Sequence, residues 1–242
     1  MFNEIDQKKL LLDQKRPLPV HTLRSIREHL IVNWTYHSNA IEGNTLTLSE
    51  TKVALEGITV GGKTIKEHLE VINHKDAILY VEDIVSRQEP LSEWQIKNIH
   101  RLILKGIDDE NAGGYRSQNV IISGAKHIPP DFIQVHALME ELIRTYNTTW
   151  QEDTHPIERS AFLHIEFVKI HPFIDGNGRT ARLLLNFELM KNGYPPIVIE
   201  KEDRADYYSA LDIAHTSGDP ELFLQLVTKT LHRTFDLYLR LL

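Results

Sequence analysis

Residues 171–182 have the sequence HPFIDGNGRTAR, and the part before Arg179 separates two segments with helical periodicity, 156–169 and 179–192. Gly176 and Gly178 allow the backbone to turn sharply, and neither carries a β-carbon that would block the close approach of a ligand. Successive backbone N–H groups then converge at the start of a helix, where the helix dipole is positive. The stretch therefore predicts a loop between two helices that binds an anion.

Charged and titratable side chains accompany this predicted anion site. Arg179 and Arg182 are three residues apart, so they leave the first helical turn in the same direction. Two cations are unfavourable at a helix N-terminus, and a bound polyphosphate would resolve that conflict. Asp175 adds one carboxylate, which together with substrate phosphates suits Mg²⁺. His171 has a side chain whose usual pKa of about 6.5 suits proton abstraction from a hydroxyl. The alternative is a glycine turn with solvated arginines, which this combination of residues disfavours.

Helical patterns fill most of the remaining chain. Apolar residues recur at helical spacing over 23–41, and the capping boxes 47–50 and 92–95 open further helices. The pattern changes between 107 and 130, where the β-branched stretch 120–122 is followed by Ser123-Gly124 and then by Lys126-His127-Ile128. This arrangement predicts a small β-hairpin that ends at Pro129-Pro130. We therefore expect an all-α fold of about eight helices with one small β-hairpin.

Length and composition limit the class of protein. The chain has 242 residues, a length that suits one substantial hydrophobic core. Its net charge is −7. It has no cysteine, which excludes a disulfide scaffold, a cysteine nucleophile and a thiolate metal site. The acidic balance gives no basis for general nucleic-acid binding, and no apolar run approaches the ~18 residues of a membrane span. The N-terminus lacks the apolar core of a secretory signal. We expect a cytoplasmic protein without a nucleic-acid or membrane partner.

The sequence HPFIDGNGRTAR resembles the signature HPFx(D/E)GNGRxxR of Fic-domain proteins at every fixed position. Most members of that family transfer AMP from ATP to a Ser, Thr or Tyr hydroxyl of a target protein. The resemblance extends to Gly114-Tyr115-Arg116 and to residues 120–130, which look like the family's flap hairpin. It covers roughly residues 30–230. The resemblance implies the Fic fold and a protein adenylyltransferase that modifies an unidentified target protein and itself, and relatives often form a homodimer.

The resemblance also implies a role for individual residues. His171 would be the general base, and Asp175 would hold Mg²⁺, for which Mn²⁺ can substitute. The ATP phosphates would be bound by the residues of the glycine turn and by the two arginines, namely Gly176, Asn177, Gly178, Arg179 and Arg182. The adenine and ribose would contact Tyr207, Tyr208 and His215. The flap residues that dock the target by strand addition would be Val120, Ile121, Ile122 and Ser123.

A second motif lies upstream, where residues 38–44 have the sequence SNAIEGN. It resembles the family's inhibitory motif, (S/T)xxxE(G/N). Ser38 and Glu42 are four residues apart and share a helix face. A carboxylate at a helix C-terminus is disfavoured by the dipole, and Arg182 is the obvious cation to pair with it. Glu42 would then occupy the place of the γ-phosphate and inhibit transfer. A solvated Glu42 before a glycine cap is the alternative.

The motifs divide the chain into two regions. We expect an N-terminal helical region over 1–90, with the inhibitory helix at about 22–43, and a Fic catalytic core with C-terminal helices over 91–242. Three other functions stay open. Glu42 can also position a water that removes AMP from the target. A different transfer, of phosphate or phosphocholine, is disfavoured because Gly178 and Arg179 are intact. A non-enzymatic nucleotide-binding regulator is disfavoured because the catalytic signature is complete.

Overall fold

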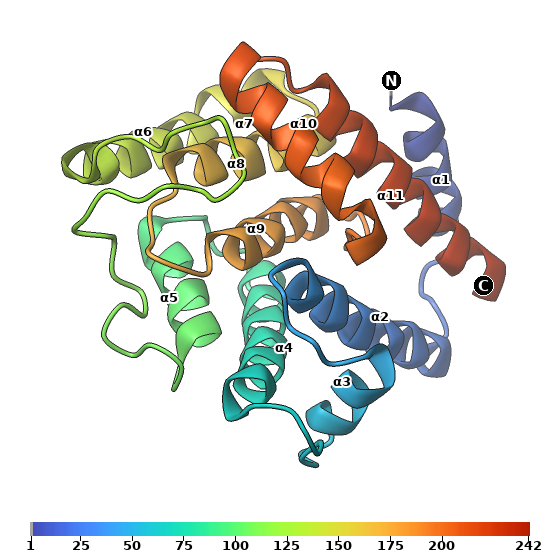
Figure 1. Cartoon of the computed structure of the whole chain (residues 1–242). Helices are drawn as coiled ribbons and strands as arrows, with labels where there is room; N and C mark the ends of the chain where they lie inside the picture. Colours follow the sequence, from blue (N-terminus) through green and yellow to red (C-terminus); the bar gives the residue numbers. More distant parts are fainter. Residues whose placement is uncertain (1) are drawn as a thin grey trace.

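A computed structural model describes residues 2–242, and all regular structure within them is helical (Figure 1). The expected all-α class is confirmed, and α1 and α7 are helices that the sequence patterns did not indicate. In chain order the α-helices are α1 (Asn3–Gln14), α2 (Val20–Ile41), α3 (Leu48–Leu55), α4 (Ile65–Ser86), α5 (Glu93–Leu104), α6 (Val135–Asn147), α7 (Thr149–Asp153), α8 (Pro156–Ile170), α9 (Asn177–Lys191), α10 (Arg204–Ser217) and α11 (Glu221–Leu241), with short 3₁₀ helices η1 (Phe132–Gln134) and η2 (Lys201–Asp203).

Helix α9 forms the centre of the molecule. It packs against α8, α4, α5 and α2, and Figure 1 shows these helices arranged around it. A helix that is enclosed on all sides must be apolar around most of its circumference. The run 183–185 is LLL, and each of these leucines is buried. The same is true of Phe187 and Leu189 further along the helix. This packing fixes the N-terminus of α9, which follows the glycine turn, deep within the fold.

The N-terminal helices place the second motif. Helix α2 buries Ile26, Leu30, Trp34 and Ile41 on one face, as the helical spacing predicts. It ends at Glu42, because Gly43 takes a left-handed conformation with φ 98°. The capping box that opens α3 is present as predicted, with Thr47 accepting from the backbone N–H of Glu50.

The expected β-hairpin flap is wrong. Residues 118–130 form an irregular segment between α5 and η1, without a strand in the part of the chain that the structure describes (Figure 1). A single turn bond, from Ala125 N to Ile122 O, joins its two arms. The physical reason is that an isolated pair of strands is marginally stable without a third strand or a covering helix. No helix covers this segment at Ile121, whose side chain is 85% exposed. We keep the name flap for residues 118–130.

Hydrogen bonds between side chains and backbone groups hold the flap in place. The carboxylate of Asp212, on α10, accepts hydrogen bonds from the backbone N–H groups of Lys126 and His127 at 2.8 and 3.0 Å. Asn119 accepts from the backbone N–H of Phe132 at the start of η1. The flap is therefore held by side-chain hydrogen bonds to α10 and to η1, rather than by backbone pairing between its own two arms. Among the described residues, no helix has the length and apolar character needed to span a bilayer.

Candidate functional site

The glycine turn connects α8 to α9 through two left-handed residues. His171 ends α8 with φ 51°, and Gly176 precedes the first residue of α9 with φ 77°. Asn177 closes the loop, because its side-chain oxygen accepts from the N–H of Phe173 and its amide group donates to the carbonyl of Phe173. The Asn177 side chain is thus occupied in shaping the turn. The first backbone N–H groups of α9 have no partner within the helix, which is the kind of position where proteins bind anions.

His100, on α5, contacts this turn and stabilises it. The sequence patterns did not indicate this role of His100. Its Nδ1 accepts from the N–H of Gly113, so Nε2 carries the hydrogen and donates to the carbonyl of Asp175 at 2.8 Å. Its ring stacks on Phe173. A β-carbon at Gly176 would lie only 3.2 Å from the His100 ring, which explains the glycine there. Burial lowers the pKa of His100 to about 4, so the ring is neutral at neutral pH.

The two motifs meet at Arg182. Its Nη2 donates to the Glu42 carboxylate at 2.7 Å and to the carbonyl of Ser38 at 2.8 Å, while its Nε donates to the Ser38 hydroxyl at 3.0 Å. The guanidinium is buried, whereas the Glu42 side chain is 32% exposed. The same Glu42 oxygen lies against Gly178, where a β-carbon would be 2.4 Å away. A carboxylate therefore occupies the surface of the glycine turn.

Arg179 is a buried cation with unused donors. Its guanidinium lies 3.4 Å from the carboxylate of Asp175 and 3.6 Å from that of Glu70, on α4. Its Nε and Nη1 have no hydrogen-bond partner. Buried polar groups are almost always hydrogen-bonded, so these open donors fit a site for an additional anion. Glu70 was not singled out from the sequence, because nothing near residue 70 in the chain indicates a partner at residue 179.

Asp175 is the carboxylate expected to hold a metal. Its side chain is 54% exposed beside Arg179. Among the side chains that the structure describes, which exclude that of Asp153, no group of three or more His, Asp or Glu residues lies close enough to hold a metal ion unaided. A divalent ion at Asp175 would need further oxygen ligands from a bound polyanion and from water. The residues present fit that arrangement, since the open Arg179 donors lie beside the same carboxylate.

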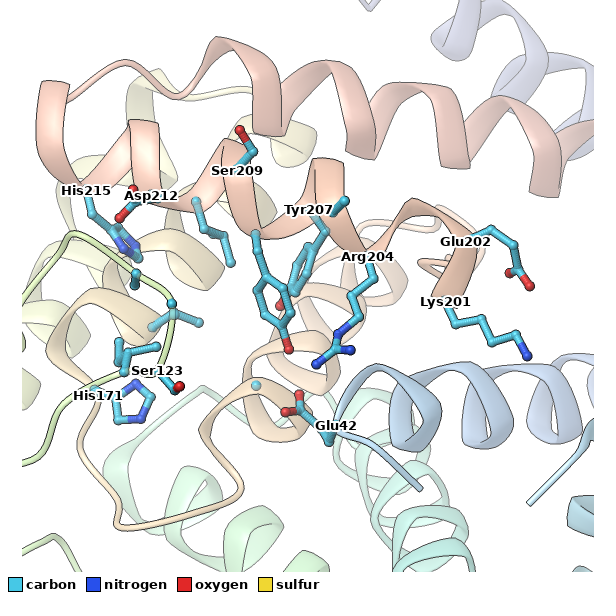
Figure 2. A pocket seen from close by; sticks show the side chains of 18 residues that line it. Glu42, Ser123, His171, Lys201, Glu202, Arg204, Tyr207, Ser209, Asp212 and His215 are labelled. Atoms are coloured by element: carbon cyan, nitrogen blue, oxygen red, sulfur yellow. The ribbon is translucent and has the colours of Figure 1, made fainter. Parts of the chain in front are cut away.

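A cavity of about 920 Å³ opens in front of the turn (Figure 2). His171 and Glu42 lie on one side of it, and Arg204, Asp212 and His215 project from α10 on the other. This volume is within the range of pockets that enclose a small ligand. Burial lowers the pKa of His171 to about 4, and the positive charge of Arg116 acts in the same direction. His171 is therefore a neutral imidazole that can accept a proton.

The three residues expected to contact adenine and ribose all line this cavity, but the exposure of their side chains differs. Tyr207 is buried, and its hydroxyl accepts from Arg182 Nη1 at 3.3 Å and lies 3.0 Å from His164 Nε2. It therefore supports Arg182 in this arrangement. Tyr208 lies at the cavity with the Arg204 guanidinium 5.4 Å from the centre of its ring. His215 lines the cavity as well and is bonded to the carbonyl of Ile165.

The expected docking residues of the flap separate into two groups. Ile122 and Ser123 line the cavity, and Figure 2 shows Ser123 on the same side of it as His171, whereas the Ile121 side chain is exposed. Val120 is partly exposed. In the described residues, the backbone of Val120 and Ile121 has no hydrogen bond to another backbone group. The segment is thus open to an added chain, although it is not itself a strand.

Comparisons with known proteins identify the relatives of the chain. Residues 90–189 match the Fic/DOC family. A Fic-domain-containing signalling protein of Bacteroides thetaiotaomicron has a similar crystal structure, with a TM-score of 0.90, 31% identity and coverage of 98% of this chain and 97% of that one. Fic-1 of C. elegans, residues 134–508, has a TM-score of 0.88 and 33% identity over 97% of this chain and 70% of that one.

A curated relative, the protein adenylyltransferase Fic of Nematostella vectensis, is 40% identical over 99% of this chain and 56% of its own length. Further relatives with that name, from Drosophila species, are 35–36% identical. The chain spans about half the length of the curated relatives it matches.

Proposed function

The chain belongs to the Fic/DOC family, and from that premise we propose that it transfers AMP from ATP to a hydroxyl group of a protein. The observation that carries this proposal is the convergence of three features on one cavity. They are His171, whose imidazole is neutral, Gly178 in the first turn of α9, and Glu42, which connects the cavity to the buried Arg182 behind it. The curated relatives named adenylyltransferase support the same chemistry.

His171 acts as the general base of the reaction. It accepts the proton of the target hydroxyl, and the hydroxyl oxygen forms a bond to the α-phosphorus of ATP. The bond between the α-phosphorus and the oxygen that bridges to the β-phosphate breaks, and pyrophosphate leaves. With a pKa of about 4 the imidazole is unprotonated at neutral pH, which is the form that can accept a proton.

The anion site stabilises the leaving group. Negative charge grows on the β- and γ-phosphates as the bond breaks, and fixed cations at that place lower the barrier. Arg179 has two nitrogen atoms without a hydrogen-bond partner, of which Nη1 lies 3.6 Å from Glu70, and it suits the β-phosphate. Arg182 suits the γ-phosphate once its carboxylate partner has moved. Asp175 would hold Mg²⁺, with Mn²⁺ as a substitute, and the metal supplies charge neutralisation of the phosphates.

Glu42 inhibits the transfer. Its carboxylate makes the bond to Arg182 that a phosphate oxygen would otherwise make, and it lies over Gly178. ATP can then bind only with its γ-phosphate displaced from that place, which misaligns the α-phosphorus relative to His171. Ser38 strengthens the inhibited arrangement, because it contributes two further bonds to Arg182 from α2.

Removal of AMP from the target is a second candidate function. One observation favours it: Glu42 is partly exposed and lines the same cavity as His171. A carboxylate in that position can activate a water molecule for attack on the phosphodiester. Incubation of AMP-modified target with the unchanged chain and with Glu42→Gly separates the functions, because only removal requires Glu42.

Labelled ATP tests the proposed transfer. With Glu42→Gly protein in a cell lysate, we expect the label to enter protein from the α-phosphate and not from the γ-phosphate. Transfer of γ-label would indicate a kinase, and no transfer of either label would exclude AMP transfer to the proteins present. His171→Ala is the control, which should abolish labelling and leave ATP binding nearly unchanged. Mass spectrometry of the labelled bands identifies the target and any self-modification.

A further inference from the structure

Arg116 is a buried arginine that lies outside the motif of residues 171–182. It is 3% exposed, and it forms no ion pair among the described residues. Its side chain instead donates to three backbone carbonyls, those of His171, Gln118 and Pro130. A buried guanidinium without a carboxylate is costly, so its retention calls for a reason other than the stability of an ion pair.

The first of these contacts holds the catalytic histidine. Arg116 Nε donates to the carbonyl of His171 at 2.9 Å, and the backbone N–H of Arg116 donates to the carbonyl of Pro172 at 2.8 Å. Two consecutive carbonyls are thus fixed by one residue. His171 has a left-handed backbone with φ 51°, which is unfavourable for a residue with a β-carbon. Such a conformation persists only where surrounding contacts enforce it, and Arg116 supplies contacts at this point.

The other two contacts hold the ends of the flap. Arg116 Nη1 donates to the carbonyl of Gln118 at 2.9 Å, and Nη2 donates to the carbonyl of Pro130. These carbonyls stand where the flap begins and where it ends. Because the flap has no strand pairing of its own, this guanidinium connects its two ends. The same side chain therefore joins the flap to the backbone of His171.

We propose that Arg116 is a positioning residue that sets the distance between the flap and His171, and so aligns the target hydroxyl with the base. This inference rests on the proposed AMP transfer. Arg116 lies outside the set of residues that we assign to the ATP phosphates. Its loss should therefore lower kcat for transfer and leave KM for ATP unchanged.

The charge of Arg116 gives a second, independent signature. The charged or titratable groups that influence the His171 ring are Arg116, Glu42 just after α2, and His127 from the flap. Burial is the largest cause of the depressed pKa of His171, and Arg116 and His127 depress it further, whereas Glu42 raises it. Removing the positive charge of Arg116 should therefore raise the pKa of His171 above about 4. A lysine at this position keeps the charge but cannot reach three carbonyls at once.

The test compares Arg116→Lys and Arg116→Gln, each added to Glu42→Gly so that transfer can be measured. The readouts are kcat and KM for ATP with α-labelled ATP, the melting temperature, and the NMR titration of the His171 ring, assigned by its loss in His171→Ala. Arg144→Gln is the matched control, since Arg144 is exposed and pairs with Glu141 on the surface of α6. The titration needs no ATP, so it judges Arg116 even if the chain transfers no AMP.

We expect both substitutions to lower kcat by about 100-fold, the size of effect that small misplacements of reacting groups cause, with KM for ATP unchanged. We expect the pKa of His171 to rise in Arg116→Gln and to stay near that of the parent in Arg116→Lys. The proposal is overturned if kcat of both variants stays within about threefold of the parent. It is also overturned if kcat falls while the pKa of His171 in a folded Arg116→Gln protein is unmoved, because Arg116 would then have only a structural role. If Glu42→Gly itself shows no transfer, the proposed function fails, and the titration alone decides the role of Arg116.

Discussion

Replacing Glu42 with glycine is expected to raise the rate of AMP transfer by about 10-fold to about 150-fold. The γ-phosphate must break the bond of 2.7 Å between Glu42 and Arg182 before it can bind there. A hydrogen bond between charged groups contributes about 1.5–3 kcal/mol, which corresponds to that range of equilibrium constants. Because the Glu42 side chain is 32% exposed, water weakens the pair, and the lower end of the range is expected. Glycine is compatible with the backbone here, since φ is −86°.

The assay is the initial rate of protein labelling from α-labelled ATP, together with the affinity for ATP by calorimetry. Glu42→Gln separates charge from shape, because it keeps the side chain and removes the carboxylate. The matched control is Glu202→Gln, since Glu202 lines the same cavity but is 61% exposed and lies 3.8 Å from His37 rather than beside Arg182. If Glu42→Gly labels no faster than the unchanged chain, or if Glu202→Gln accelerates labelling equally, the inhibitory role of Glu42 is refuted.

Three further predictions concern the glycine turn and its surroundings. Gly178→Ala introduces a β-carbon 2.4 Å from the Glu42 carboxylate and 3.1 Å from Arg182, so the affinity for ATP by calorimetry should fall at least about tenfold; an unchanged affinity would contradict the close approach of phosphate to this residue. Asp175→Asn should raise the Mg²⁺ concentration that gives half-maximal transfer by about tenfold or more, and an unaltered Mg²⁺ titration would count against Asp175 as the metal ligand. Burial lowers the pKa of His100 to about 4 in the folded protein, whereas the pKa of a histidine in the unfolded chain is about 6.5. Between these two pH values the unfolded state binds more protons than the folded state. The free energy of unfolding therefore falls as the pH drops from about 6.5 to about 4, by up to about 1.4 kcal/mol per pH unit. The urea concentration at the unfolding midpoint should therefore be lower at pH 5 than at pH 7, and the two midpoints should be more nearly equal in a folded His100→Gln variant. If the unmodified chain has the same midpoint at pH 5 and pH 7, this prediction is refuted.

The sequence was most informative where the relevant residues are close together in the chain. The glycine turn of residues 171–182 could be predicted because short-range spacing sets the direction of each side chain at a helix start. The shared face of Ser38 and Glu42 followed from the helical period in the same way. The pairing of Glu42 with Arg182 spans 140 residues. It could be anticipated only because the two residues have opposite charges and because both belong to motifs that resemble those of one family.

Residues whose role depends on distant partners could not be predicted. His100 bonds to the carbonyl of Asp175, 75 residues further along the chain, and nothing near residue 100 indicates this. Glu70 and Arg116 are similar cases. The flap was predicted as a hairpin because Val120, Ile121 and Ile122 have high β-propensity, which depends strongly on neighbouring strands. The fold provides no third strand here, so the propensity was not realised.

The open backbone of the flap also bears on how the protein behaves at high concentration. An extended segment with free N–H and C=O groups can pair with any extended chain, including another copy of itself, which is a route to aggregation. The arm 119–122 is short, however, and the other arm contains Lys126 and the pair Pro129-Pro130. Charge repels a second copy, and proline lacks the N–H that would continue the ladder. The extended part of the flap is therefore too short and too interrupted to seed a fibril.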